Sequence, residues 1–121
     1  MYVKRGGKLV KITKKSIGAV SPSLLKTKRD AFERKKKTAA FKRWRRYQYE
    51  VVNGRCCTYC RHRYSGPIFV DHYIPLFRGG TSAYKNLRIT CKPCNDYKSI
   101  QMPNKELIFR LSCGAACRGR H

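Results

Sequence analysis

Two short cysteine pairs place the strongest constraint on the fold of this chain. Cys57 and Cys60 are separated by two residues, and the same spacing recurs in Cys91 and Cys94, with 30 residues between the pairs. Each pair can present two thiolates from one tight turn, and two pairs complete a tetrahedral shell around a zinc ion. Four unrelated buried thiols would not explain the repeated spacing. We therefore predict a four-cysteine zinc site that joins these two segments.

The complete shell leaves no open coordination position, so we expect this zinc to be structural. Cys56 could take the place of Cys57, and His62 could replace one thiolate, although the spacing favours the four cysteines. The chain has 7 cysteines and no export signal, which indicates thiols or metal ligands in an intracellular, reducing setting rather than a secreted disulfide framework. No pattern indicates a role for Cys56, Cys113 or Cys117.

Positive charge dominates the composition and predicts a polyanionic partner. The chain has 29 Lys and Arg against 6 Asp and Glu, a formal net charge of +23. Such an excess repels itself in a folded chain and is tolerated where a polyanion neutralises it. Residues 1–49 hold 17 basic and 2 acidic residues, so +15, and residues 50–121 hold 12 and 4, so +8. Nucleic acid is the expected partner, and an anionic membrane surface comes second.

The first part of the chain is predicted to be a basic arm with a short hairpin and a helix. Residues 2–5 and 8–12 flank Gly6-Gly7, a pair that suits a two-residue hairpin turn; a disordered basic tail is the alternative. Ser21-Pro22 is a helix-start signal. The apolar positions change face near residues 35–38, which predicts two helical pieces or one helix whose halves face different partners.

Aromatic and basic residues alternate near the end of this helical region. The aromatic side chains could stack on bases, but we expect them to pack against the following domain; they are Phe41, Trp44, Tyr47 and Tyr49. The basic residues between them would then face DNA phosphates; they are Lys42, Arg43, Arg45 and Arg46. Asn53-Gly54 is predicted to end the helix.

The region between and after the cysteine pairs predicts a hairpin followed by a helix. Extended runs are expected over 67–74 and 87–90, with a Gly79-Gly80 turn and a helix that begins near Asn95. A further helix is expected over 106–111. The overall prediction is an α+β fold.

Polar residues of this region follow a recognisable order. Asp71-His72 precedes Ile74-Pro75, then come Gly79-Gly80 and Asn86-Leu87, and Asn95 directly follows the second cysteine pair, with Lys98 three residues on. This order, together with the CxxC pairs, resembles the HNH nucleases, the zinc-bearing branch of the ββα-metal (His-Me finger) endonucleases. The resemblance covers residues 43–98.

The resemblance implies a role for each matching residue. His72 would be the general base that takes a proton from the attacking water, and Asn86 would brace the loop that orients it. Asp71 and Asn95 would hold one divalent ion, Mg²⁺ or Mn²⁺, for which carboxylate and amide oxygens are suitable ligands. The third histidine of the family's name is replaced by Asn95, a variant pattern (H-N-N).

Elementary chemistry supports the same set of residues. A histidine with an ordinary pKa near ~6.5 is largely neutral at pH 7–8 and can accept a proton. A bound divalent ion can stabilise the charge on the phosphate and the leaving oxygen. Arg78 and Lys98 are expected to neutralise flanking phosphates. Adjacent strand residues point to opposite faces, so the strand must end or twist at Asp71-His72 for both to reach one phosphate.

These expectations define three segments: a DNA-contacting arm over 1–49, an HNH nuclease domain over 50–112, and a mobile tail over 113–121. The expected activity is hydrolysis of double-stranded DNA to 5′-phosphate and 3′-hydroxyl ends, by nicking or, in a homodimer, by cutting both strands. The alternative from another class is a non-catalytic zinc-knuckle protein that binds nucleic acid. It explains the charge and the cysteines but not the ordered polar residues. A membrane-surface peptide leaves the cysteine pairs unexplained.

Overall fold

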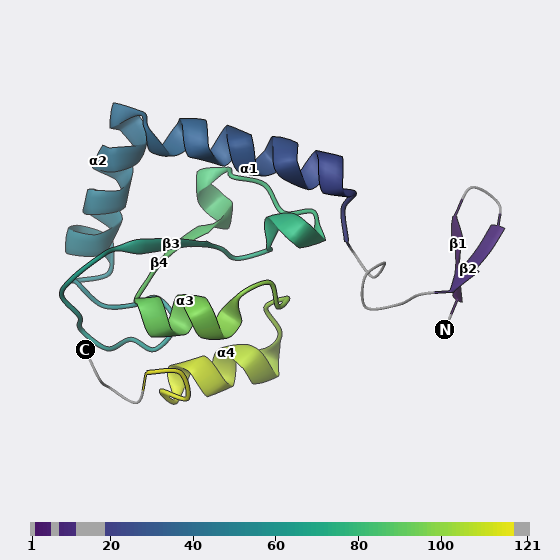
Figure 1. Cartoon of the computed structure of the whole chain (residues 1–121). Coiled ribbons are helices and arrows are strands. Elements are labelled where there is room, and N and C mark those ends of the chain that lie inside the picture. The colour runs from purple at the N-terminus through teal and green to yellow at the C-terminus, as the bar shows by residue number, and fades with distance from the viewer. Residues whose placement is uncertain (1, 6–7, 12–18, 118–121) are drawn as a thin grey trace.

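An antiparallel hairpin followed by a helix lies at the centre of the computed structural model, which describes residues 2–5, 8–11 and 19–117 (Figure 1). Strand β3 (Phe69–His72) pairs with β4 (Leu87–Thr90), and α3 (Lys92–Lys98) follows directly. The predicted α+β arrangement of two strands and a helix is confirmed. However, α3 begins at Lys92 rather than near Asn95, because the extended Cys91 serves as N-cap and Pro93 fits the first helical turn.

Two helices precede the hairpin, and the break between them lies in the predicted region. Helix α1 (Pro22–Lys36) begins where the Ser21 hydroxyl accepts the Leu24 N–H at 3.2 Å. Thr38 caps α2 (Ala39–Tyr47) in the same way, since its hydroxyl accepts the Phe41 N–H at 3.1 Å. A π-helical segment, Gln48–Val52, continues α2, and the helical region ends at Asn53 as predicted.

The predicted N-terminal hairpin is present. Strand β1 (Tyr2–Arg5) pairs antiparallel with β2 (Lys8–Lys11), and the register joins Tyr2 to Lys11 and Arg5 to Lys8. The Gly6-Gly7 connection and Ile12 lie outside the described residues.

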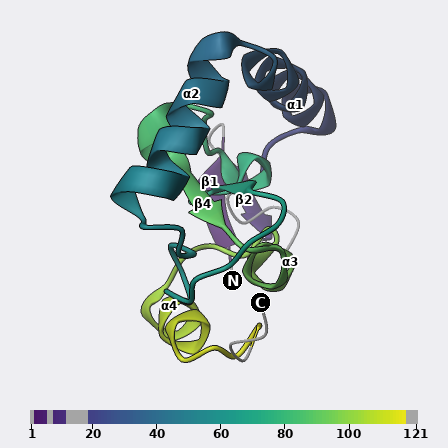
Figure 2. The ribbon, with the colours of Figure 1, turned by 90° about the vertical axis from the view of Figure 1, so that its left-hand side faces the viewer.

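The described helical part of the predicted arm packs on the hairpin. Phe32 of α1 and Phe41 of α2 form a buried cluster with Leu87 of β4. In both views, β3 and β4 lie between the α1–α2 pair and the α3–α4 pair (Figures 1 and 2). The expected boundary between residues 49 and 50 therefore runs through a shared core. The aromatic residues pack as expected at Phe41 and at the buried Tyr49, whereas Tyr47 is 55% exposed.

Helix α4 (Lys105–Ser112) covers the cysteine-rich side of the core. Its N-cap Asn104 accepts the Leu107 N–H at 2.8 Å, and Leu107 and Leu111 are buried among the cysteines. The chain then turns, and Cys117 is only 3% exposed. Within the expected tail over 113–121, Gly114 and Cys117 are thus buried against the domain, whereas Cys113 and Ala115 are exposed. Among the described residues, no helix is both long and apolar enough to cross a membrane.

Packing of α2 on the hairpin predicts a large stability effect. Phe41 is 1% exposed, so Phe41→Ala should lower the free energy of unfolding by about 3–5 kcal/mol through lost burial and the cavity it leaves. Phe109→Ala is the matched control, because Phe109 is 67% exposed and its loss should change stability by less than about 0.5 kcal/mol. Urea unfolding measures both. Equal effects of the two variants would contradict this packing.

Candidate active site

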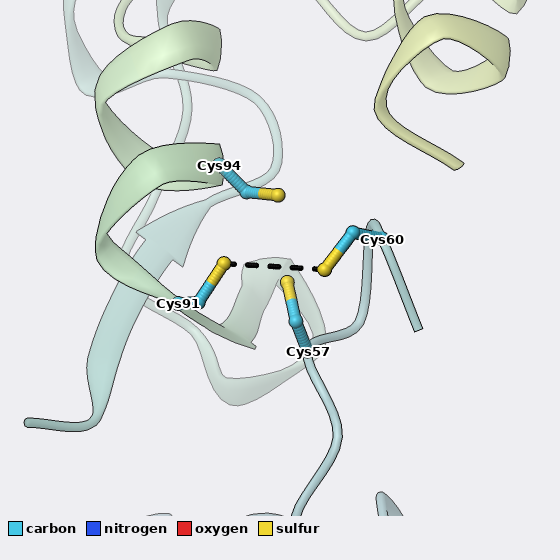
Figure 3. A group of neighbouring side chains, drawn as sticks. All are labelled: Cys57, Cys60, Cys91 and Cys94. Atoms are coloured by element: carbon cyan, nitrogen blue, oxygen red, sulfur yellow. Dashed lines mark hydrogen bonds between the residues drawn. The ribbon is translucent and has the colours of Figure 1, made fainter. Parts of the chain in front are cut away.

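The four predicted zinc ligands lie together in one buried cluster. Cys57 and Cys60 come from the loop before β3, and Cys91 and Cys94 from the N-terminal end of α3; all four point toward a common centre (Figure 3). Their sulfur atoms lie within 4.8 Å of one another, and the Sγ atoms of Cys60 and Cys91 are 4.0 Å apart. The cluster joins the segment that precedes β3 to the segment that follows β4.

The chemistry of this cluster fits a structural metal such as zinc. Burial raises the pKa of the Cys60 and Cys91 thiols, so four thiolates cannot accumulate here without a compensating cation. A tetrahedral zinc with Zn–S bonds near ~2.3 Å places its sulfur atoms about 3.8 Å apart, close to the separation found between Cys60 and Cys91. A closed shell of thiolates would leave no position for a substrate.

Asp71 is a buried carboxylate with two strong partners. It is 6% exposed, and its Oδ2 accepts the Tyr59 hydroxyl at 2.5 Å and lies 3.0 Å from Nζ of Lys98. Burial raises the pKa of Asp71, and the positive charge of Lys98 acts in the opposite direction. Among the described residues, both polar contacts of this carboxylate fall on Oδ2, so Oδ1 is left for another ligand.

Lys98 does not lie where we predicted. It is fully buried, and its Nζ donates to the backbone carbonyl of His72 at 2.9 Å in addition to its ion pair with Asp71. Burial lowers the pKa of this lysine, while the charge of Asp71 opposes that effect. Lys98 is thus an internal partner of the strand that carries Asp71 and His72, not a surface cation facing a phosphate.

His72 is held between α1 and the loop that joins β3 to β4. Its Nε2 lies 3.0 Å from the Ser82 hydroxyl, and the Phe32 ring meets the imidazole edge-on with centroids 4.4 Å apart. Burial, followed by the positive charges of Lys98 and Lys36, lowers the pKa of His72 to about 4. The imidazole is therefore neutral near pH 7 and can accept a proton.

Asn86 fastens the same loop, as the bracing role requires. Its Oδ1 accepts the Ile74 N–H at 2.8 Å, and its Nδ2 donates to the carbonyls of Ile74 (3.0 Å) and Thr81 (2.7 Å). Gly80 is needed in this loop, because a Cβ there would lie 1.8 Å from the Ile74 carbonyl oxygen. The loop conformation therefore depends on Asn86 and on the absence of a side chain at residue 80.

Helix α1 holds the loop from the other side. Nζ of Lys28 donates to the Gly80 carbonyl at 2.8 Å, and Nζ of Lys35 donates to the Ser82 carbonyl at 2.7 Å. The position of Ser82, and with it the orientation of His72, depends on a helix that lies far upstream in the sequence. Sequence reasoning missed Ser82 and both lysines, since a loop serine and helical lysines carry no distinguishing pattern.

Asp71, His72 and Asn95 border one open cavity of about 190 Å³. Strand β3 ends at His72, which allows adjacent residues to line the same space despite the alternation of a strand. Arg29 of α1 also lines the cavity, and its side chain is exposed. The sequence alone did not indicate it as a site residue.

The other basic residues that were predicted to bind DNA do not line this cavity. Nε of Arg78 donates to the Ile100 carbonyl at 3.0 Å. The α2 residues line a separate shallow depression with Ile68; they are Lys42, Arg43, Arg45 and Arg46. The structure thus places a positive surface on α2, apart from the cavity.

Comparison with known families identifies the domain that contains these residues. No curated protein matches the chain. A family model described as HNH endonuclease matches residues 57–109, which span all four cysteines, Asp71, His72, Asn86 and Asn95. The matched segment begins and ends later than the resemblance noted from the motifs, and it includes most of α4. Residues 57–109 of this chain are an HNH endonuclease domain.

Proposed function

We propose that this chain is a metal-dependent endonuclease that hydrolyses phosphodiester bonds in double-stranded DNA to 5′-phosphate and 3′-hydroxyl ends. One observation carries the proposal: a neutral histidine, a carboxylate and a side-chain amide border the same open cavity within the HNH domain. This combination supplies a proton acceptor and two hard oxygen ligands beside a space that can admit a phosphate.

His72 acts as the general base through Nδ1. In the tautomer that this role requires, Nε2 carries the hydrogen and donates to the Ser82 hydroxyl 3.0 Å away, and the lone pair on Nδ1 can accept the proton of the attacking water. Ser82 and Asn86 are positioning residues: Ser82 holds the orientation of the His72 ring, and Asn86 fixes the loop that carries Ser82.

Asp71 and Asn95 would hold the divalent ion, Mg²⁺ or Mn²⁺. The Asp71 Oδ1 and the amide oxygen of Asn95 suit a hard cation, and two protein ligands leave positions for substrate oxygens. Such an ion, when bound, stabilises the charge of the transition state and of the leaving oxygen. Tyr59 and Lys98 keep the Asp71 carboxylate in place through its other oxygen.

Arg29, rather than Lys98, would neutralise a phosphate beside the cleaved bond. It is exposed and lines the cavity, so its guanidinium can pair with a phosphate oxygen of the DNA strand. The basic residues of α2 would contact the DNA backbone beyond the cleaved bond, without base readout; they are Lys42, Arg43, Arg45 and Arg46.

The neutral base gives a pH prediction. Because burial lowers the pKa of His72 to about 4, its imidazole signal in an NMR titration should move near pH 4, well below the ordinary ~6.5. Because the pKa of His72 is lower in the folded protein than in the unfolded chain, protonation of His72 favours the unfolded chain. The free energy of unfolding should therefore be fully retained above pH ~6.5 and should decline as the pH falls from ~6.5 toward 4. The His72→Asn spectrum identifies the signal. A midpoint near 6.5 would contradict the burial of this base.

Cleavage of supercoiled plasmid separates the base from the metal ligands. His72→Ala should lower the cleavage rate about 10²–10⁴-fold, with little change in the Mn²⁺ concentration that gives half-maximal rate. Asn95→Ala should instead raise that concentration. Asp71→Ala is a poorer probe, because it leaves Lys98 buried without its partner, which costs about 3–5 kcal/mol. Wild-type cleavage by His72→Ala would favour a non-catalytic zinc-knuckle protein.

A matched pair of arginines tests the phosphate contact. Arg29→Ala should slow cleavage at saturating DNA by about 10–100-fold, since an exposed guanidinium is screened more than an enclosed donor. Arg34→Ala removes an exposed arginine of the same helix that does not line the cavity, and its rate should remain near wild type. Equal rates of the two variants would remove Arg29 from the site.

A further inference from the structure

Cys60 belongs to a second group of metal-ligating side chains. Its Sγ, a ring nitrogen of His62 and the Sγ of Cys117 all lie within 4.8 Å of one another. Cys117 is buried, and its Sγ is 3.5 Å from Nδ1 of His62. Cys60 is therefore shared by two sets of donors: the other three cysteines of the cluster, and the Cys117 thiol with the His62 imidazole.

The fold brings Cys117 to this place by a turn after α4. Leu111 is fully buried and anchors the end of the helix, and Gly114 has a φ of +82°, the left-handed conformation that ends helices. The Gly114 N–H donates to the Leu111 carbonyl and the Ala115 N–H to the Arg110 carbonyl, both at 3.0 Å. The chain is redirected toward the cysteine cluster, so the buried position of Cys117 is set by the helix and its cap.

We propose that Cys117, with His62 beside it, is a reserve ligand for the structural metal site and can replace Cys60 in the fourth position. The proposal rests on the four-cysteine metal site and not on the cleavage activity. A zinc ion accepts thiolate and imidazole ligands without a preference imposed by its d electrons, so such a replacement preserves a tetrahedral shell.

The exchange is a balanced substitution without electron transfer. The bond between the metal and Cys60 breaks, and the released thiolate takes up a proton. That proton comes from the Cys117 thiol, whose sulfur then forms the new bond with the metal. The charge at the metal is the same before and after, because one thiolate replaces another. When Cys60 is absent, His62 can instead donate a nitrogen directly.

The arrangement is asymmetric, and the asymmetry supplies the control. Within the described part of the chain, the second group of ligating residues includes Cys60 but not Cys91 or Cys94. Cys94 is as deeply buried as any ligand, at 0% exposed, and among residues 19–117 it belongs to no second group of ligating side chains. Loss of Cys60 and loss of Cys94 should therefore have different consequences for metal binding, although both remove one thiolate.

Cobalt loading of the full-length chain measures that difference. Cys60→Ala should still bind one Co²⁺ per chain, weakened by less than about tenfold, with a thiolate charge-transfer absorption like that of wild type if Cys117 replaces the lost ligand. Cys94→Ala should bind at least about 100-fold more weakly, since each ligand supplies a large share of the binding energy of such sites. Cys117→Ala in the intact site should leave binding near wild type.

A triple variant, Cys60→Ala with His62→Ala and Cys117→Ala, should fall to the level of Cys94→Ala. Two results would overturn the proposal: Cys60→Ala that fails to fold or binds as weakly as Cys94→Ala, or a triple variant that binds as well as Cys60→Ala. Because metal content and absorption are the readouts, the result is independent of whether the protein cleaves DNA.

Discussion

Four buried sulfur atoms hold together the parts of this domain that carry its chemistry. The cysteine cluster joins the loop before β3 to the start of α3, and these two segments carry Asp71 and Asn95 toward the same cavity. A small core of this size has little apolar area with which to fix a strand and a helix to one another. A metal bound at this point would supply that link, so the relative placement of Asp71 and Asn95 would depend on the four cysteines.

The second requirement is that the positive charges buried inside this very basic chain have partners. Lys98 and Asp71 neutralise one another in a buried pair, and Tyr59 satisfies the same carboxylate oxygen. Lys28 and Lys35 donate hydrogen bonds to backbone carbonyls of the loop between β3 and β4. Part of the positive charge that suggested a DNA-binding arm thus has an internal structural function, while other basic residues of α1 and α2 are exposed.

The sequence was sufficient for features that depend on local spacing. The cysteine pairs and the hairpin follow from short motifs, and the helix break near residues 35–38 follows from the change of apolar face. Asp71, His72 and Asn95, which were expected from the motif, border one cavity. It was insufficient where contacts join distant segments. Nothing near Lys98 distinguishes a lysine that pairs with a buried carboxylate from one that faces a phosphate.

The same limit applies to α1 and Cys117. Their contacts with Ser82, His72 and His62 depend on how helices pack, which a pattern of neighbouring residues does not specify. The start predicted for α3 is too late for a local reason. A turn is the expected setting of Cys91 and Cys94, but Cys94 lies inside the helix.

Phe32 has a consequence for the evolution and engineering of such nucleases. Its ring covers His72 and completes the core around Leu87, yet it lies upstream of the segment that the family model matches. A graft limited to residues 57–109 would transfer Asp71, His72 and Asn95 without the ring that contributes to the burial of the His72 imidazole, and burial is what lowers its pKa. The smallest transplantable module of this protein therefore starts before Pro22. A chimera that replaces α1 would change the pKa of His72.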